Sequence, residues 1–298
     1  MYINHNQMAS NVANTLTSHY SNLATSTQRL SSGLRVNGAA DDAAGLAIRE
    51  LMRSDIAALN QGVRNANDAI SLLQTADGAL GVIDEKLIRM KELAEQAATG
   101  TYDSTQRLMI ESEYQAMASE ITRIANATDF NGMKLLDGTL SGDHIGSGGG
   151  DNKLSSQGKM KIHFGTMNDS AEDYYYIEIG DCTASAFGVG NQASTDAKAY
   201  TVSTQAAAQS ALVGINDAIV SKDKIRAHLG ALQNRLENTI TNLTTQAENL
   251  QAAESRISDV DVATEMTNFV RNQILTQSAV AMLSQANSMP QMAMQLIG

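Results

Sequence analysis

The sequence predicts a mainly α-helical protein: a long antiparallel coiled-coil hairpin formed by the N- and C-terminal segments, with a small β-rich insert between them. Three observations support this fold class. One proline and no tryptophan occur in 298 residues, so very long helices are possible. Leucines recur every seven residues in both halves of the chain. Half of the few aromatic residues lie between positions 164 and 200, which marks a separate segment.

The first helical pattern is almost uncharged and ends in a turn. Its apolar stripe repeats every seven residues among Asn, Ser, Thr and Ala, at Leu16, Leu23 and Leu30. Residues 31–38 follow with Ser-Ser-Gly and Asn-Gly, which favour turns. Asp41 and Asp42 stand where a new helix would begin, so we expect both to cap it.

Residues 43–98 predict a rod-like helix. Its core positions, spaced in multiples of seven, include Leu59, Leu73, Leu80 and Leu87. The companion positions are first Ile56, Val63 and Ile70 and then move by one residue to Ala76 and Ile83, as a helix of 3.6 residues per turn drifts against a strict heptad. Residues 104–127 predict a second, shorter helix. Asn131-Gly132 after it predicts a hairpin turn.

The composition changes from Gly138 onward. Residues 146–150 are rich in glycine and predict a linker, since no Gly-Lys-Ser/Thr of a phosphate-binding loop follows. Residues 160–164 and 174–179 predict two strands joined by a polar loop. Together with the aromatic residues, they predict a small β-rich insert over residues 140–204 with its own minor core.

The helical pattern resumes at Gln205. Its heptad leucines are Leu229, Leu236, Leu243 and Leu250. Each contributes roughly 1.5–3 kcal/mol when buried, so this seam can hold a long helix against the first rod. Residues 258–261 then have the Ser-x-x-Asp form of a capping box, which predicts a second turn. The helical segment behind that turn is apolar at Met266, Val270 and Ile274.

Charge is almost absent from both ends. The only charged residues within positions 1–38 are Arg29 and Arg35, and those within positions 262–298 are Glu265 and Arg271. Solvated termini are normally charged, so we expect these ends to be buried in an assembly, and to stay disordered and protease-sensitive until partner chains supply contacts. The expected hinges between neutral ends and charged coils are Gly33, Arg35, Asp41 and Asp42 on one side, and Ser258 and Asp261 on the other.

Several function classes are disfavoured. The net charge of −11 and pI of about 4.8 argue against a nucleic-acid partner, which needs a basic face. No apolar run is long enough to span a membrane, and no secretory signal peptide is visible at the start. The single cysteine, Cys182, is expected to be a small buried apolar residue. The histidines lack metal-ligand spacing and no catalytic constellation occurs, so we expect no cofactor, no metal and no enzyme activity.

Motifs at both ends carry a resemblance to a known family. The N-terminal ones lie at residues 28–35, 41–45, 64–68 and 130–132, and the C-terminal ones at residues 229–235, 255–257 and 263–266. In combination they resemble bacterial flagellin, the subunit of the flagellar filament. The resemblance covers about residues 1–137 and 205–298 and leaves out the insert.

The resemblance implies a subunit of a helical homopolymer with three domains. Residues 1–42 with 258–298 would form the inner core that lines the channel of the filament. Residues 43–139 with 205–257 would form a helical rod with a β-hairpin, and residues 140–204 would form a variable outer insert. It further implies export through the flagellar type III apparatus to the extracellular flagellum. The expected partners are other copies of the chain, an export chaperone, and the cap and hook-associated proteins.

The resemblance also implies a contact with an immune receptor. Arg89, Lys91 and Leu93 lie in a segment similar to the one bound by the vertebrate Toll-like receptor for flagellin, and Glu113 matches an accessory contact on the next helix. Lys91 stands where the best-known versions have Arg, and the two side chains differ in forked hydrogen bonding. The competing interpretation is an ordinary solvated helix face.

Two alternative functions remain open at the level of sequence. A hook–filament junction protein shares terminal patterns with flagellin, although the dense match at both hinges favours flagellin. A coiled-coil signalling adaptor would not need neutral ends. Some flagellins hold protease inserts, but this insert is short and lacks zinc ligands.

Overall fold

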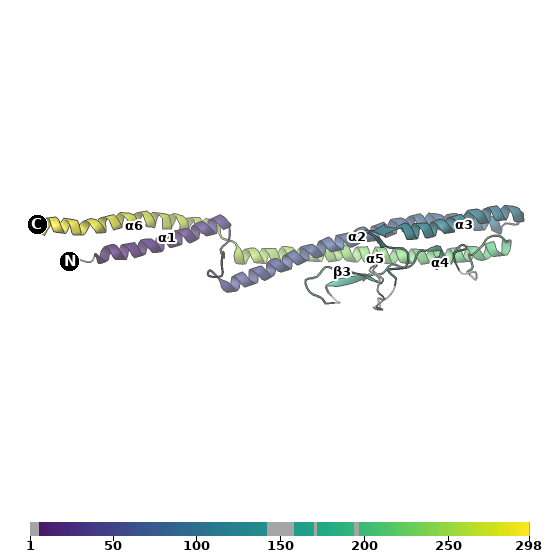
Figure 1. Ribbon diagram of the computed structural model, residues 1–298, viewed down its shortest axis with the longest axis horizontal. Coiled ribbons are helices and arrows are strands. Elements are labelled where there is room, and N and C mark those ends of the chain that lie inside the picture. The colour runs from purple at the N-terminus through teal and green to yellow at the C-terminus, as the bar shows by residue number, and fades with distance from the viewer. Residues whose placement is uncertain (1–5, 142–157, 170–171, 194–196, 298) are drawn as a thin grey trace. The chain divides into compact units, whose positions relative to one another are not determined.

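The computed structural model describes residues 6–141, 158–169, 172–193 and 197–297 of the chain. The predicted linker at residues 146–150 lies outside these ranges. The described chain is mainly helical, which confirms the predicted fold class (Figure 1). Its helices are α1 (Gln7–Ser32), α2 (Ala43–Ala98), α3 (Ser104–Ala127), α4 (Ala184–Phe187), α5 (Gln205–Ser258) and α6 (Val262–Ile297). No helix in the described ranges has the length and apolar composition needed to cross a membrane.

The chain forms two compact units. The first contains Met1–Ala57 and Ala247–Gly298, and the second contains Ala58–Gln246. The borders between the units fall within α2 and α5, so each of these helices contributes to both. The division into three domains expected from the resemblance stays a prediction.

The second unit has a helical core shared by α2, α3 and α5. The largest fully buried side chains include Leu73, Leu80, Ile83, Leu87 and Met90 from α2, and Tyr114 and Ile121 from α3. From α5, Ile215, Leu229 and Leu236 join the same core. Ala76, Ile83 and Met90 are all fully buried, so the predicted one-residue drift of the companion positions is confirmed.

Two small antiparallel hairpins lie on this helical unit. Strands β1 (Asp129–Phe130) and β2 (Met133–Lys134) flank the predicted Asn131-Gly132 turn, where φ is 51° and 80°. Strands β3 (Met160–His163) and β4 (Tyr174–Ile177) pair with Met160 opposite Ile177. Both hairpins are where the sequence predicts strands.

The predicted separate core of the insert is wrong. Ile177, Ile179, Cys182, Phe187 and Val189 belong to the same buried cluster as the helices. A two-stranded hairpin has too little surface to bury by itself, so the insert packs its apolar side on the helices instead. Cys182 is fully buried, as expected, and its burial raises the pKa of the thiol to about 12.

Candidate functional site

The two predicted hinges are hydrogen-bonded to each other. The backbone N–H of Arg35 donates to the carbonyl oxygen of Ser258 at 2.6 Å, and that of Val260 donates to the carbonyl of Gly33 at 3.0 Å. The Arg35 guanidinium donates to the carbonyl of Ile257, also at 2.6 Å. Gly33 itself ends α1 in the left-handed conformation, with φ of 73°. Two turns that lie far apart in the sequence therefore form one short antiparallel bridge.

The two aspartates of the first turn have different roles. Oδ1 of Asp42 accepts a hydrogen bond from the N–H of Gly45 at 2.9 Å, so Asp42 caps α2 as predicted. Oδ2 of Asp41 instead accepts from the N–H groups of Asn37 and Gly38, at 3.1 and 3.2 Å. The predicted cap at Asp41 is wrong, because its carboxylate closes the preceding turn.

In the second turn the cap is Asp261. Its Oδ1 accepts from the N–H groups of Ala263 and Thr264, at 3.0 and 3.3 Å, and its Oδ2 accepts from the Thr264 hydroxyl at 2.8 Å. Ser258 is the buried last residue of α5. The predicted capping box beginning at Ser258 is therefore wrong, because α5 continues through this residue and α6 begins only after Asp261.

Replacing Arg35 with Ala is expected to weaken assembly while the coil stays folded. The change removes the guanidinium bond to Ile257 but keeps the backbone bridge. We expect the critical concentration for filament growth to rise several-fold, since each 1.4 kcal/mol of association free energy is a factor of ten. Sedimentation of polymer measures this effect. Arg35→Lys keeps a charge but not the forked donor, so its critical concentration should lie between those of wild type and Arg35→Ala. A critical concentration equal to wild type for Arg35→Ala would contradict the role.

The Asp261 cap predicts a pH dependence at the start of α6. Hydrogen bonds from the hydroxyl and N–H of Thr264, and from the N–H of Ala263, lower the pKa of Asp261 below its ordinary value of 3.8. Because the folded-state pKa is lowered, the cap stabilises α6 above about pH 4 and is lost as the pH falls through the folded value. In the filament, the protection factor of the Thr264 amide should therefore fall below about pH 4. Asp261→Asn keeps a neutral cap and should remove this dependence, and an unchanged acid response in that variant would contradict it.

α1 and α6 pack against each other along heptad faces. The face of α1 consists of half-buried or buried residues, Ala9, Val12, Leu16, His19, Leu23, Ser26 and Leu30. The corresponding face of α6 consists of Glu265, Phe269, Asn272, Thr276, Ala279, Leu283 and Ala286. The Asn6 side chain donates to the carbonyl of Ala286 at 2.8 Å, and Arg29 lies 4.0 Å from Glu265, so the helices are antiparallel. The predicted leucine stripe of α1 therefore lies toward α6.

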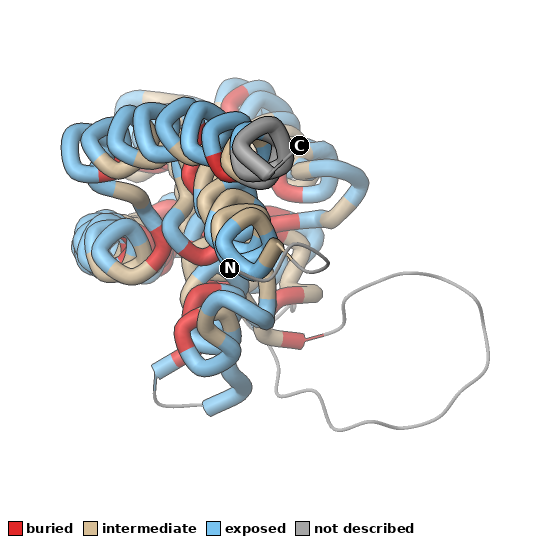
Figure 2. The backbone as a smooth tube through the Cα atoms, turned by 90° about the vertical axis from the view of Figure 1, so that its left-hand side faces the viewer, coloured by how far each residue is buried: buried red, intermediate tan, exposed pale blue. Residues whose placement is uncertain are grey.

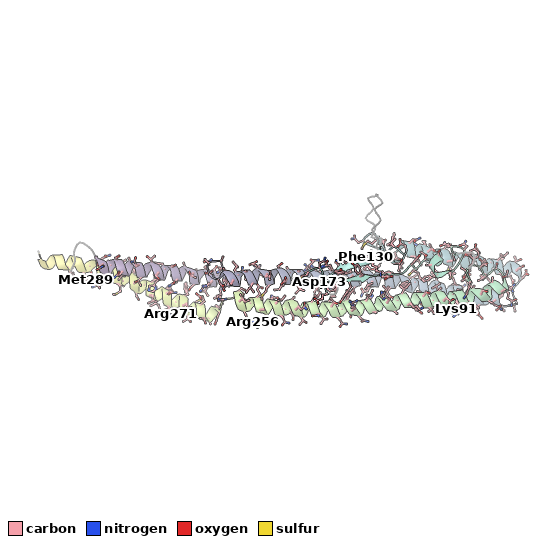
Figure 3. All side chains as sticks on the ribbon, turned by 90° about the horizontal axis from the view of Figure 1, so that it is seen from below. Lys91, Phe130, Asp173, Arg256, Arg271 and Met289 are labelled. Atoms are coloured by element: carbon pink, nitrogen blue, oxygen red, sulfur yellow. The ribbon has the colours of Figure 1, made fainter. Side chains whose placement is uncertain are left out.

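The predicted apolar stripe of α6 lies elsewhere. Met266, Val270 and Ile274 are 43%, 44% and 57% exposed, and they fall between the positions that form the buried face. Met282 and Met292 are exposed as well. Most of α6 is drawn as exposed in Figure 2, and Arg271 and Met289 mark the helix in Figure 3. The chain alone thus leaves an apolar face of α6 uncovered.

The leucines predicted for the coil core lie on α2 and α5, and all but one are buried. Seven of them are buried, namely Leu59, Leu73, Leu80, Leu87, Leu229, Leu236 and Leu243. Leu250 is half-buried. Sequence reasoning missed a buried cation beside them: Lys222 is only 2% exposed, and its Nζ lies 2.6 Å from Oδ1 of Asp84. Asp84 is half-buried on α2, and its carboxylate pairs with this lysine.

The residues predicted for receptor contact are partly brought together. Nε and Nη2 of Arg89 on α2 donate to one carboxylate oxygen of Glu113 on α3, at 3.0 and 2.8 Å, and Nη1 donates to Glu92 at 2.9 Å. Lys91 is exposed on the same part of α2 and is labelled in Figure 3. Leu93 is 1% exposed and lies in the helical core, so its predicted place on this surface is wrong.

Comparison with known proteins agrees with these observations. The bacterial flagellin N-terminal helical region matches residues 3–141, and the bacterial flagellin C-terminal helical region matches residues 212–297. A flagellin of Bacillus subtilis (strain 168) is 42% identical over 313 residues, covering 100% of both chains. Flagellin FlaB2 of Treponema pallidum (strain Nichols) is 40% identical over 297 residues, again covering 100% of both.

A solved structure also shares the fold. A putative flagellar hook-associated protein from Vibrio parahaemolyticus has a TM-score of 0.54, and the match covers 74% of this chain and 100% of that one. Its 14% identity supports the fold alone, so the full-length relatives favour a flagellin over a junction protein. The chain belongs to the bacterial flagellin family, whose members are the structural, self-polymerising subunits of the extracellular flagellar filament.

Proposed function

We propose that this flagellin polymerises through the exposed apolar face of α6, defined by Met266, Val270 and Ile274. The observation that carries the proposal is the side of the helix on which these residues lie. α6 packs on α1 through its Glu265 and Thr276 side and leaves the apolar side open. An apolar face of this kind is typical of an interaction surface.

Burial of this face contributes favourable free energy to assembly. Burying one Val, Ile or Met side chain contributes about 1.5–3 kcal/mol, so three of them supply several kcal/mol per subunit. The contact joins one face of a subunit to a different face of the next. When the rotation between neighbours does not close into a ring, repetition of such a heterologous contact produces a helical polymer.

The seam between α1 and α6 supports folding coupled to assembly. Three polar side chains are buried along it, those of Ser26, Glu265 and Thr276. In the described part of the chain, Nδ1 of His19 and Nε of Arg29 are buried without a hydrogen-bond partner. Buried polar groups cost free energy, and more so when unpaired. We therefore expect the isolated α1–α6 pair to be only marginally stable and the polymer to complete its packing.

A cysteine introduced at Ile274 tests the interface. In a Cys182→Ala background, Ile274→Cys should react rapidly with a maleimide in the monomer and at least tenfold more slowly after seeded polymerisation. Tyr176→Cys provides the control, since Tyr176 is 52% exposed on the insert, which we place on the outside of the filament. Equal reactivity of the Ile274 cysteine in monomer and filament would contradict the proposal.

We expect other partners of the subunit to bind the same face of α6. An apolar surface that stays open before polymerisation invites non-specific association, so we propose that an export chaperone covers α6 in the cell. At the two ends of the filament, subunits lack one set of neighbours. The cap and hook-associated proteins would bind the faces left open there. Coprecipitation of a candidate chaperone with wild type but not with Ile274→Asp tests the first part.

We also propose that the surface formed by Arg89, Lys91 and Glu113 contacts the vertebrate Toll-like receptor for flagellin. Its support is the resemblance together with the Arg89–Glu113 ion pair, which brings α2 and α3 together at an exposed position. The proposal omits Leu93, which is buried.

Replacing Arg89 with Ala is expected to lower receptor signalling at least several-fold in a reporter-cell assay. Arg123→Ala is the matched control, because it breaks another exposed ion pair, with Glu120 on α3, outside the proposed contact. Lys91→Arg should strengthen signalling because the guanidinium offers a forked donor. Full signalling by the Arg89→Ala variant would favour the plain solvated helix face instead.

A further inference from the structure

A charged cluster with a buried lysine lies between α2 and α5 in the second unit. Nζ of Lys222 lies 2.6 Å from Oδ1 of Asp84 and 2.7 Å from Oδ1 of Asp223. One turn further along α5, Nε of Arg226 lies 2.7 Å from Oδ1 of Asp77. The Lys222 side chain is 2% exposed, whereas the partner carboxylates are partly exposed. A lysine this deeply buried is rare, because removing an ammonium group from water costs free energy.

The lysine of this cluster occupies a heptad position that is otherwise apolar. Lys222 stands midway between Ile215 and Leu229, seven residues from each, in the core stripe of α5. On α2, Asp77 and Asp84 keep the seven-residue spacing of Ile56, Val63 and Ile70, but the core stripe has moved there to Ala76 and Ile83, so the two acids lie at its edge. A single polar residue at a coiled-coil core position characteristically fixes register at some cost in stability. The placement of Lys222, with Asp84 at the edge of the opposite stripe, fits that role.

The apolar seam alone does not define how far α5 slides along α2. Leu, Ile and Ala recur every seven residues on both helices, so a slip of one heptad places apolar residues opposite apolar residues again. The ion pairs do not repeat in this way, because the two acids are seven residues apart and the two bases are four apart. A slip in one direction would move Lys222 opposite Asp77 and leave Asp84 facing Ile215. A slip in the other direction would leave Lys222 facing Lys91. Only the observed register satisfies both pairs.

We propose that the Asp84–Lys222 and Asp77–Arg226 pairs are a register device that selects one axial alignment of α2 and α5. A single alignment gives the rod formed by α2 and α5 a defined length. Every subunit then presents its surfaces to its neighbours at the same axial position. A buried ion pair can be replaced by apolar side chains with little loss of stability. Removing the pair as a whole should therefore affect alignment more than stability.

The test uses a double variant and a distance measurement. Spin labels are attached at Gln74→Cys on α2 and His228→Cys on α5, both exposed positions, in a full-length chain carrying Cys182→Ala. Wild-type charges should give one narrow distance distribution by pulsed electron paramagnetic resonance. Asp84→Leu with Lys222→Met should add a second population, because a one-heptad slip shifts the labels by about 10 Å along the axis. Helix content and melting temperature should stay close to those of the parent.

Two control variants complete the experiment. Lys222→Arg keeps the charge and should keep the single distance. Glu120→Leu with Arg123→Met removes an exposed ion pair within α3 and should also keep it. A single unchanged distance in the Asp84→Leu/Lys222→Met variant would overturn the proposal, because the apolar seam would then set the register alone. Unfolding of that variant would also overturn it, since the pair would then act on stability rather than on alignment.

Discussion

Replacing Ile274 with Asp is expected to abolish filament growth at ordinary protein concentrations while leaving the monomer folded. Ile274 is 57% exposed on α6, so the substitution removes little packing from the monomer. In the polymer the change removes about 1.5–3 kcal/mol of apolar burial and adds the larger cost of burying an unpaired carboxylate. A loss of more than about 3 kcal/mol per subunit raises the critical concentration more than about 100-fold. Seeded growth followed by electron microscopy and sedimentation measures it.

The controls for this prediction separate interface from fold. Ile274→Val keeps most of the apolar surface and should polymerise with only a small rise in critical concentration. Circular dichroism should show the same helix content and melting temperature for Ile274→Asp and wild-type monomers. Normal filament growth by Ile274→Asp would show that this face of α6 stays exposed in the polymer.

Replacing Gly62 with Ala is expected to detach the β3–β4 hairpin from α2. The backbone of Phe164 packs directly on Gly62, and an added Cβ would lie only 2.8 Å from the Phe164 carbonyl carbon. One turn along, Asn65 donates from its side chain to the carbonyl of His163 at 2.8 Å, so the strand end has little freedom to move away. Overpacking of this kind costs roughly 1–3 kcal/mol, which exceeds the gain of about 1 kcal/mol in helix propensity.

Gly78 provides the matched comparison on the same helix. It is exposed, and an added Cβ there meets nothing within 4 Å. Gly78→Ala should therefore stabilise the chain by up to about 1 kcal/mol, so the two alanine variants should shift the melting temperature in opposite directions. Intrinsic tyrosine fluorescence and amide exchange in β3 should change only in Gly62→Ala. Equal shifts of the melting temperature in both variants would show that the β3–β4 hairpin moves away from α2 at little cost in free energy.

Sequence patterns defined most of the helices because their signals are local. The rod helix at Ala43–Ala98 and the second helix at Ser104–Ala127 begin and end where the sequence predicts. Heptad spacing, a proline-free run and flanking glycine and aspartate all indicate the same boundaries. The Asn131-Gly132 hairpin follows from turn chemistry in the same way.

Other features depend on contacts that no local pattern contains. α6 is apolar on more than one side, so its periodicity could not reveal that Glu265 and Thr276 lie toward α1 while Met266 and Ile274 lie outward. Ser258 matched a capping box, yet the bridge between the two turns keeps it at the end of α5. Lys222 did carry a signal, its place in the Leu229 heptad, but a lysine beside Asp223 and Lys224 resembles a solvated face until its partner on α2 is known.

Amide hydrogen exchange shows whether α1 and α6 become stable only among neighbouring copies. The measurement compares residues 7–32 and 262–289 in the monomer with the same residues in the filament. We expect exchange within seconds in the monomer and strong protection in the filament, while α2 and α5 are protected in both. Full protection of α1 and α6 in the monomer would rule out folding on assembly, because the terminal helices would then be stable without partners.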